Sequence, residues 1–264
     1  MLSLISAACA RMKKLSGSSD NNKQDNYMNK IFKRVLLVVV SIIILIIGAG
    51  LFYYFPMFLM PHVETSHVPD TDVYVLNAMS AVYLIKTGNG YIMIDAGLNT
   101  KTLQKSLNEF MIDPQNIKWI FLTHSDGDHT GGLSLFPNAD IYMSEDEFSL
   151  INGTAKRTIF GGNTMPSEID IHQINLFQDG QEYMINGVKI VCIKTPGHTI
   201  GSTVYLVDDQ YLFTGDAIKN RDGKTSVHPY SMNAGLSKET IDRIMKNIKW
   251  STILTSHYGI HNQK

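Results

Sequence analysis

The stretch HSDGDHTGG, residues 124–132, holds two histidines and two aspartates within its first six positions. The apolar run 119–122 precedes it and predicts a buried strand. Glycines at 127, 131 and 132 allow the backbone to turn tightly after that strand. Ligands of α/β sheets bind where strands run out into loops, and imidazole and carboxylate groups bind zinc, iron and manganese. The stretch therefore predicts a metal-binding loop; a polar turn that merely contains histidine is the alternative.

Composition narrows the class of protein. The chain has 264 residues and a formal net charge of −1, without the basic footprint of a nucleic-acid-binding protein. This length allows one sizeable domain and an appendage. The two cysteines, Cys9 and Cys192, lie far apart, which argues against a disulfide framework and excludes a cysteine-type zinc site.

The N-terminal region predicts a membrane anchor. Residues 1–34 are mostly polar and predict a disordered tail. An uncharged apolar run then begins at Val35 and ends at Phe55. At ~1.5 Å per residue this run makes roughly 31 Å of helix, enough to cross the hydrocarbon layer of a bilayer. A cleavable signal peptide and a buried core helix are the alternatives, but the aromatic and apolar residues continue as far as Met60, which favours an uncleaved anchor.

Charge on either side of this run predicts its orientation. Basic residues precede it at Lys23, Lys30, Lys33 and Arg34, whereas residues 56–75 contain no lysine or arginine. The positive-inside rule then places the N-terminus in the cytoplasm and the rest of a single-pass protein outside the cell membrane. Residues 56–69, with three prolines, predict a linker, and residues 70–264 predict the globular domain.

Within that domain, hairpins are expected at 82–94, 181–194 and 204–213 and helices at 100–111, 144–150 and 237–248. Further strands are expected at 119–122, 139–143 and 252–255. We expect Ser144 and Ser237 to cap their helices. The segment 153–170 has no clear period and predicts either a segment that covers the site or a plain surface loop.

Polar residues able to bind metal recur at the ends of the predicted strands. They are Asp95, the 124–129 cluster, His198, Asp216 and His257. Their order, in the motifs Asp95-Ala96-Gly97, His-x-Asp-x-Asp-His, Pro196-Gly197-His198-Thr199, Gly215-Asp216 and Ser256-His257, resembles that of the metallo-β-lactamase superfamily of hydrolases. The resemblance covers roughly residues 73–259.

The resemblance implies an α/β fold, a four-layer αβ/βα sandwich with a two-metal site at one edge, here preceded by one transmembrane helix. It implies that His124, Asp126 and His198 hold a first divalent metal ion and that Asp128, His129 and His257 hold a second. Asp216 would bridge the two ions, Asp128 would also act as the catalytic proton acceptor, and Asp95 would support the site by hydrogen bonding or serve only its own turn. Zinc is the expected metal, with manganese or iron as alternatives.

The sequence departs from the family's commonest pattern at Asp126, where a histidine is usual. Counting ligand charges, two divalent ions with Asp126, Asp128 and Asp216 leave +1, whereas a histidine at position 126 would leave +2. Aspartate is also shorter than histidine, so we expect a looser first site whose metal is the weaker one. The added oxygen ligand is expected to favour manganese or iron relative to zinc. The histidines outside the motifs, at 62, 67, 172, 228 and 261, are expected on the surface or in the linker, with His228 the candidate exception that lines the pocket.

The motifs around His198 and Asp216 are most similar to the glyoxalase II and lactonase-like branches, which implies a small-molecule thioester, lactone or other ester as substrate. Two alternatives stay open. One is phosphodiester cleavage, as in the metallo-domain of DNA-uptake channel proteins; the other is a non-catalytic membrane-anchored binding module. The sequence does not determine the oligomeric state.

Overall fold

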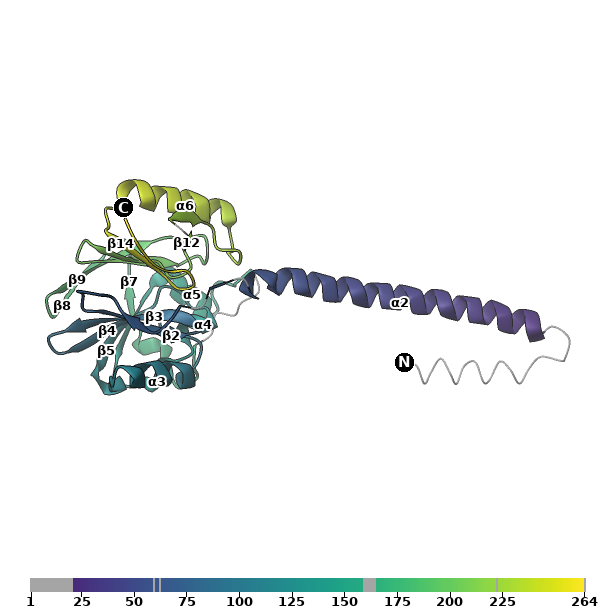
Figure 1. Ribbon diagram of the computed structural model, residues 1–264, viewed down its shortest axis with the longest axis horizontal. Coiled ribbons are helices and arrows are strands. Elements are labelled where there is room, and N and C mark those ends of the chain that lie inside the picture. Colours follow the sequence, from purple (N-terminus) through teal and green to yellow (C-terminus); the bar gives the residue numbers. More distant parts are fainter. Residues whose placement is uncertain (1–20, 59, 62, 159–164, 222, 264) are drawn as a thin grey trace. The chain divides into compact units, whose positions relative to one another are not determined.

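The chain divides into two compact units, Met1–Leu59 and Met60–Lys264. The computed structural model describes residues 21–58, 60–61, 63–158, 165–221 and 223–263. The described part of the first unit is one long helix, and the second unit is a layered α/β structure (Figure 1).

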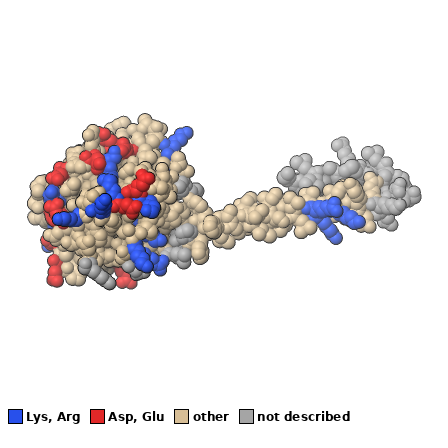
Figure 2. Space-filling view, turned by 90° about the horizontal axis from the view of Figure 1, so that it is seen from above, with Lys and Arg blue, Asp and Glu red and all other residues tan. Residues whose placement is uncertain are grey.

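The long helix, α2 (Asn21–Phe58), contains a candidate membrane span, Gln24–Phe55, whose mean hydropathy reaches 3.2 and whose side chains are not buried. Lysine and arginine gather toward its N-terminal end, and the rest of its surface is uncharged (Figure 2). The helix is longer than we predicted: residues 21–34 of the expected disordered tail and residues 56–58 of the expected linker are helical. Extending a formed helix adds one hydrogen bond for each residue fixed, so extension costs much less than nucleation. Residues 1–20 of the predicted tail lie outside the described residues.

The first sheet has seven strands in the order β1-β2-β3-β4-β5-β6-β7. Neighbours from β1 to β4 are antiparallel, and those from β4 to β7 are parallel. The strands are β1 (Ser66–His67), β2 (Val73–Ala78), β3 (Ser80–Thr87), β4 (Gly90–Ile94), β5 (Ile117–Phe121), β6 (Asp140–Ser144) and β7 (Asn175–Phe177). Helix α3 (Thr100–Glu109) connects β4 to the segment before β5, the short α4 (Gly127–Thr130) follows β5, and α5 (Glu145–Ile151) follows β6.

The second sheet has six strands in the order β15-β14-β11-β10-β9-β8. All neighbours are antiparallel except β11 and β14. The strands are β8 (Glu182–Ile185), β9 (Val188–Lys194), β10 (Thr203–Val207), β11 (Tyr211–Phe213), β14 (Thr252–Thr255) and β15 (Gly259–Asn262). A small ribbon of β12 (Lys219–Arg221) and β13 (Lys224–Ser226) and helix α6 (Ala234–Asn247) lie between β11 and β14 in sequence.

Alternation along the strands builds three apolar layers. In β9, Ile190 and Cys192 face the layer between the two sheets, whereas Ile193 faces the layer under α6. Successive side chains of a strand point to opposite faces, so one buried strand supplies both layers. The third layer packs α3, through Leu103 and Leu107, against the outer face of the first sheet. Helix, sheet, sheet and helix therefore form the predicted four-layer sandwich, with α3 and α6 on its two outer faces (Figure 1).

Most predicted elements lie within a few residues of the observed ones, and Ser144 accepts a hydrogen bond from the Glu147 amide as the expected cap of α5. The prediction for the last helix was wrong at its start. Helix α6 begins at Ala234, and the Asn233 side chain caps it by accepting a hydrogen bond from the Leu236 amide. Asparagine is as good a cap as serine, and it stands one turn earlier in the chain.

Candidate metal centre

The predicted site residues come together at one edge of the sandwich, because each follows the end of a strand. Asp95 follows β4, the 124–129 cluster follows β5, His198 follows β9, Asp216 follows β11 and His257 follows β14. Their side chains are almost fully buried, apart from Asp128, which is 31% exposed, Asp126, which is 12% exposed, and His257, which is 11% exposed.

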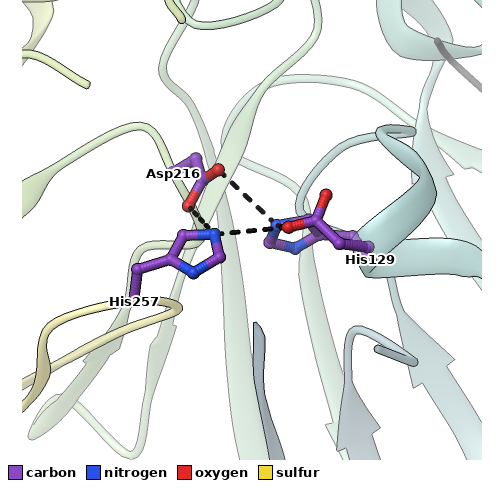
Figure 3. A group of neighbouring side chains, drawn as sticks. His129, Asp216 and His257 are labelled. Carbon is purple, nitrogen blue, oxygen red and sulfur yellow. Dashed lines mark ion pairs between the residues drawn. The ribbon is translucent and has the colours of Figure 1, made fainter. Parts of the chain in front are cut away.

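One group of possible ligands consists of Asp128, His129, Asp216 and His257, whose ligand atoms all lie within 4.8 Å of one another. His257 Nε2 is 3.3 Å from Asp128 Oδ2 and 3.4 Å from Asp216 Oδ1. His129 Nε2 is 3.7 Å from Asp128 Oδ2 and 3.6 Å from Asp216 Oδ2. Figure 3 shows His257 and His129 approaching from opposite sides, with His257 facing the Asp216 carboxylate. The four atoms could hold one divalent ion.

The other group, at the expected first metal site, consists of His124, His198 and Asp216. The Nε2 atoms of His124 and His198 are 3.2 Å apart, and they lie 4.0 and 3.8 Å from Asp216 Oδ2. Asp216 thus belongs to both groups. Its Oδ1 approaches only His257 among the described histidines, whereas its Oδ2 approaches His124, His129 and His198.

The donor atoms of both groups fit divalent ions such as zinc. His129 Nε2 is buried and has no hydrogen-bond partner among the described residues, which is costly unless the atom has a ligand. The His124 and His198 nitrogens face each other at hydrogen-bonding distance; a cation between them would satisfy both lone pairs. A pair of imidazoles with carboxylate oxygens is a usual ligand set for zinc.

Asp95 orients His129. Asp95 Oδ2 is 2.8 Å from His129 Nδ1, and Oδ1 accepts a hydrogen bond from the Thr123 amide at 2.8 Å. The Thr123 hydroxyl donates to Asp95 Oδ2 at 2.8 Å and lies 3.0 Å from His124 Nδ1. Because that hydroxyl proton is used on Asp95, Thr123 Oγ accepts from His124 Nδ1–H. Both histidines therefore present Nε2 to the site, with Nδ1 held from behind.

Backbone packing explains the double glycine at 131 and 132. A side chain on Gly131 would collide with the Leu98 carbonyl, and one on Gly132 would collide with the Ala96 carbonyl. The Gly132 amide also donates to the Ala96 carbonyl at 3.1 Å. Close approach of the loop after β4 to helix α4 brings Asp95 within reach of His129.

Arg157 is a site residue that the sequence did not reveal. Its side chain is 4% exposed, and it donates to both carboxylate oxygens of Asp126, from Nε at 3.1 Å and from Nη2 at 2.8 Å. It also donates to the carbonyls of His198 and Tyr230. Arg157 lies in the segment 153–170, so this segment does reach the site; residues 159–164 lie outside the described part.

The arginine corrects our charge count. Asp126 Oδ2 faces His198 Nε2 at 3.3 Å and His124 Nε2 at 3.6 Å, but Asp126 belongs to neither group of converging ligand atoms among the described residues. The Asp126–Arg157 pair is neutral. Two divalent ions with Asp128 and Asp216 therefore leave +2, the value that a neutral histidine at position 126 would leave in a site without the arginine.

His228 is buried beside the site, as expected of the candidate exception. Its Nε2 is 3.7 Å from Asp216 Oδ2, and its ring lies between the rings of His198 and His257, with centroids 4.9 and 5.9 Å away. Neither ring nitrogen has a hydrogen-bond partner in the described structure. His67 and His172 are exposed and His261 is half-buried, whereas His62 lies outside the described residues.

The histidines of the site differ in the direction in which their pKa values are shifted. Burial disfavours the charged form of His257, but the Asp216 and Asp128 carboxylates outweigh it and raise the pKa of His257 to about 10. Burial also disfavours the charged form of His129, but the Asp95 and Asp128 carboxylates outweigh it and hold the pKa of His129 above its ordinary range. Burial dominates at His228 and lowers its pKa to about 3. His228 is therefore a neutral imidazole at physiological pH, able to donate or accept a hydrogen bond.

A four-layer sandwich with histidines and aspartates at the ends of its strands defines a class of metal-dependent hydrolases. The sequence profile of the metallo-β-lactamase superfamily matches residues 77–247. This match covers more than half of the chain, and the protein belongs to that superfamily of hydrolases. Members typically bind divalent metal ions, often zinc.

Relatives support the assignment of the domain. The chain is 26% identical over 162 residues to an atrochrysone carboxyl ACP thioesterase of Cryptosporiopsis sp., covering 59% of this chain and 44% of the thioesterase. It is 32% identical over 155 residues to the uncharacterized protein YobT of Bacillus subtilis, covering 53% of this chain and 63% of YobT. The matches span less than half the length of the fungal relatives.

Solved structures share the fold. The subclass B3 metallo-β-lactamase BJP-1 of Bradyrhizobium japonicum superposes with a TM-score of 0.56 at 20% identity, covering 75% of this chain and 79% of that one. A β-lactamase from Chitinophaga pinensis superposes with a TM-score of 0.58 at 21% identity, covering 75% and 79%. At these identities the likeness establishes the architecture of the domain.

Proposed function

We propose that this protein hydrolyses a small-molecule thioester, lactone or other ester, using two divalent metal ions. Zinc is the expected metal. The observation that carries the proposal is the pair of ligand groups that share Asp216 through its two carboxylate oxygens. The similarity to a fungal ACP thioesterase favours a thioester. Within the described part of the chain the cysteine present, Cys192, is buried between the sheets and does not belong to the centre.

We assign each side chain a role. His124, Asp126 and His198 hold the first ion, and Asp128, His129 and His257 hold the second, with Asp216 shared between them and Asp95 holding His129 from behind. The bound ions would supply Lewis acidity, which lowers the pKa of water toward ~7 and polarises a carbonyl oxygen.

Asp128 is the proposed proton acceptor. It is the most exposed carboxylate of the centre, at 31%, so a reacting water can reach it. The nearby His129 and His257 outweigh the effect of burial and hold the pKa of Asp128 below its ordinary range. Asp128 therefore stays ionised and can accept a hydrogen bond from that water.

A substrate panel tests the proposal. The full chain in detergent, loaded with zinc or manganese, should cleave members of a set of thioesters and lactones and spare β-lactams and bis-aryl phosphodiesters. Asp128→Ala should abolish the turnover, whereas Asp140→Ala, at an exposed carboxylate on β6, should leave it unchanged. Preferential phosphodiester cleavage would favour a nuclease-like function, and the absence of both turnover and bound metal would favour a binding module.

The candidate span leads to a proposed location. The cluster Lys30, Lys33 and Arg34 lies toward the N-terminal end of α2. By the positive-inside rule we propose that the N-terminus lies in the cytoplasm and the hydrolase domain outside the cell membrane. An alkaline phosphatase fused after Lys264, which is active only outside the cytoplasm, should then be active. An inactive fusion in a stable protein would reverse the orientation.

A further inference from the structure

The guanidinium of Arg157 is bound to the residue in which this chain departs from its family. Arg157 donates to both oxygens of Asp126 and to two backbone carbonyls. These hydrogen bonds are largely shielded from water, because the arginine side chain is 4% exposed and the aspartate side chain is 12% exposed. A buried bidentate pair of this kind is geometrically specific, and a buried arginine without its carboxylate is strongly unfavourable.

The same aspartate faces the first metal group. Its Oδ2 is 3.3 Å from His198 Nε2 and 3.6 Å from His124 Nε2, while Arg157 Nη2 is 2.8 Å from that Oδ2 atom. The cationic side chain is therefore separated from the site only by the carboxylate. Without the carboxylate, the guanidinium would repel any divalent ion in the first group.

We propose that Asp126 and Arg157 function as one neutral unit that takes the place of a histidine in the first metal site, with Arg157 as its positioning residue. This inference rests on the proposed function. It explains why an acidic residue can stand at position 126 without lowering the charge of the centre. It also predicts that restoring a histidine at position 126 alone harms the site, because the buried arginine then loses its partner.

Zinc binding to four variants tests the coupling. Each variant also carries His257→Ala, which weakens zinc binding at the second metal site. The single binding step that remains then measures zinc affinity at the site of His124, His198 and Asp216. The full chain in detergent is titrated with zinc against a chromophoric chelator, and cobalt spectra report the ligand geometry. The four are the parent, Asp126→His, Arg157→Met and Asp126→His/Arg157→Met.

Asp126→His should weaken zinc binding by at least about tenfold, because an uncompensated cation faces the ion. Arg157→Met should strengthen binding by a similar factor, because the carboxylate is no longer neutralised. The double variant should bind within about threefold of the parent and show a cobalt spectrum with one more nitrogen ligand. Arg243→Met, at an exposed arginine that donates to the Lys194 carbonyl, is the matched control and should change nothing.

Equal affinity of Asp126→His and the parent, or a double variant no better than Asp126→His, would overturn the inference. If Asp126→His fails to fold, weaker rather than stronger binding by Arg157→Met would overturn it. A parent chain with both groups intact that binds no zinc would overturn the proposed function, and the inference with it. Zinc binding by the parent that neither Asp126→His nor Arg157→Met changes would overturn the inference alone.

Discussion

Glu147 holds Ser125 by two hydrogen bonds to a single oxygen: Oε1 accepts from the Ser125 amide at 2.8 Å and from its hydroxyl at 2.6 Å. The other oxygen, Oε2, accepts from the Thr199 hydroxyl at 2.5 Å and from the Gly201 amide at 3.2 Å. The carboxylate is 1% exposed. One buried side chain of α5 therefore joins the loop that carries His124 to the loop that carries His198.

Glu147→Ala should destabilise the domain by about 3 kcal/mol or more, because several buried donors lose a charged acceptor at once. Thermal unfolding of the full chain in detergent is the measurement. Glu145→Ala, at an exposed position of the same helix, is the matched control and should lie within about 0.5 kcal/mol of the parent. Equal stability of the two variants would contradict the proposed link between the loops.

Removal of Asp95 should weaken the second metal. Asp95→Ala leaves His129 Nδ1 without its carboxylate, so the ring is no longer oriented and its basicity falls; we expect a loss of about 10- to 100-fold in metal affinity. Zinc titration against a chelator measures it. Asp140→Ala is the control, and unchanged zinc affinity in Asp95→Ala would show that Asp95 serves only its turn.

Metal uptake should depend steeply on pH. The pKa of His257 is raised to about 10, and that of His129 lies above its ordinary range, because burial is outweighed by the neighbouring carboxylates. At pH 7 both rings carry protons that a metal must displace, so affinity rises with pH by up to about 100-fold per unit. Titrations at pH 6, 7 and 8 in buffers of different ionisation enthalpy count the protons released. An affinity independent of pH would contradict these protonation states.

The raised pKa of His257 should also make the stability of the metal-free protein depend on pH. For His257, a raised pKa means that its contribution is fully present below the unfolded value near ~6.5. It is lost as pH rises through about 10. Chelator-treated protein should therefore unfold at lower temperature above pH 10 than at pH 7. His257→Gln should flatten this dependence, and an unchanged dependence in that variant would contradict the assignment.

His228 should contribute to turnover rather than to metal binding. It has unpartnered buried ring nitrogens beside Asp216 but belongs to neither ligand group of the described residues, so a substrate oxygen is the expected partner. His228→Gln should lower kcat by about 100-fold with two metals still bound. The control is His172→Gln, at an exposed histidine. Loss of one metal would instead make His228 a ligand.

Local signals account for the predicted part of the site. Asp95, Asp216 and His257 each stand within three residues after the end of a short strand, and a strand end can be recognised from a few neighbouring residues. The partly alternating burial along β9 and the complete burial of β10 likewise follow from local apolar patterns. Element boundaries were less predictable: Asn233 and Ser237 are both good caps, and only packing of α6 against the second sheet selected the earlier one.

The sequence by itself determined the candidate span and the strand-end side chains of the centre, because apolar run length and motif spacing can be read from adjacent residues. The order of its motifs indicated the fold class through their resemblance to the superfamily. Tertiary structure alone decided the partners of those side chains. Arg157 reaches Asp126 across 31 positions and Glu147 reaches Ser125 across 22. No local pattern marks either contact, since a buried charged side chain meets its hydrogen-bond partners only once the chain has folded. The charge of the first metal site, which the sequence indicated was lowered by Asp126, depends on that distant arginine.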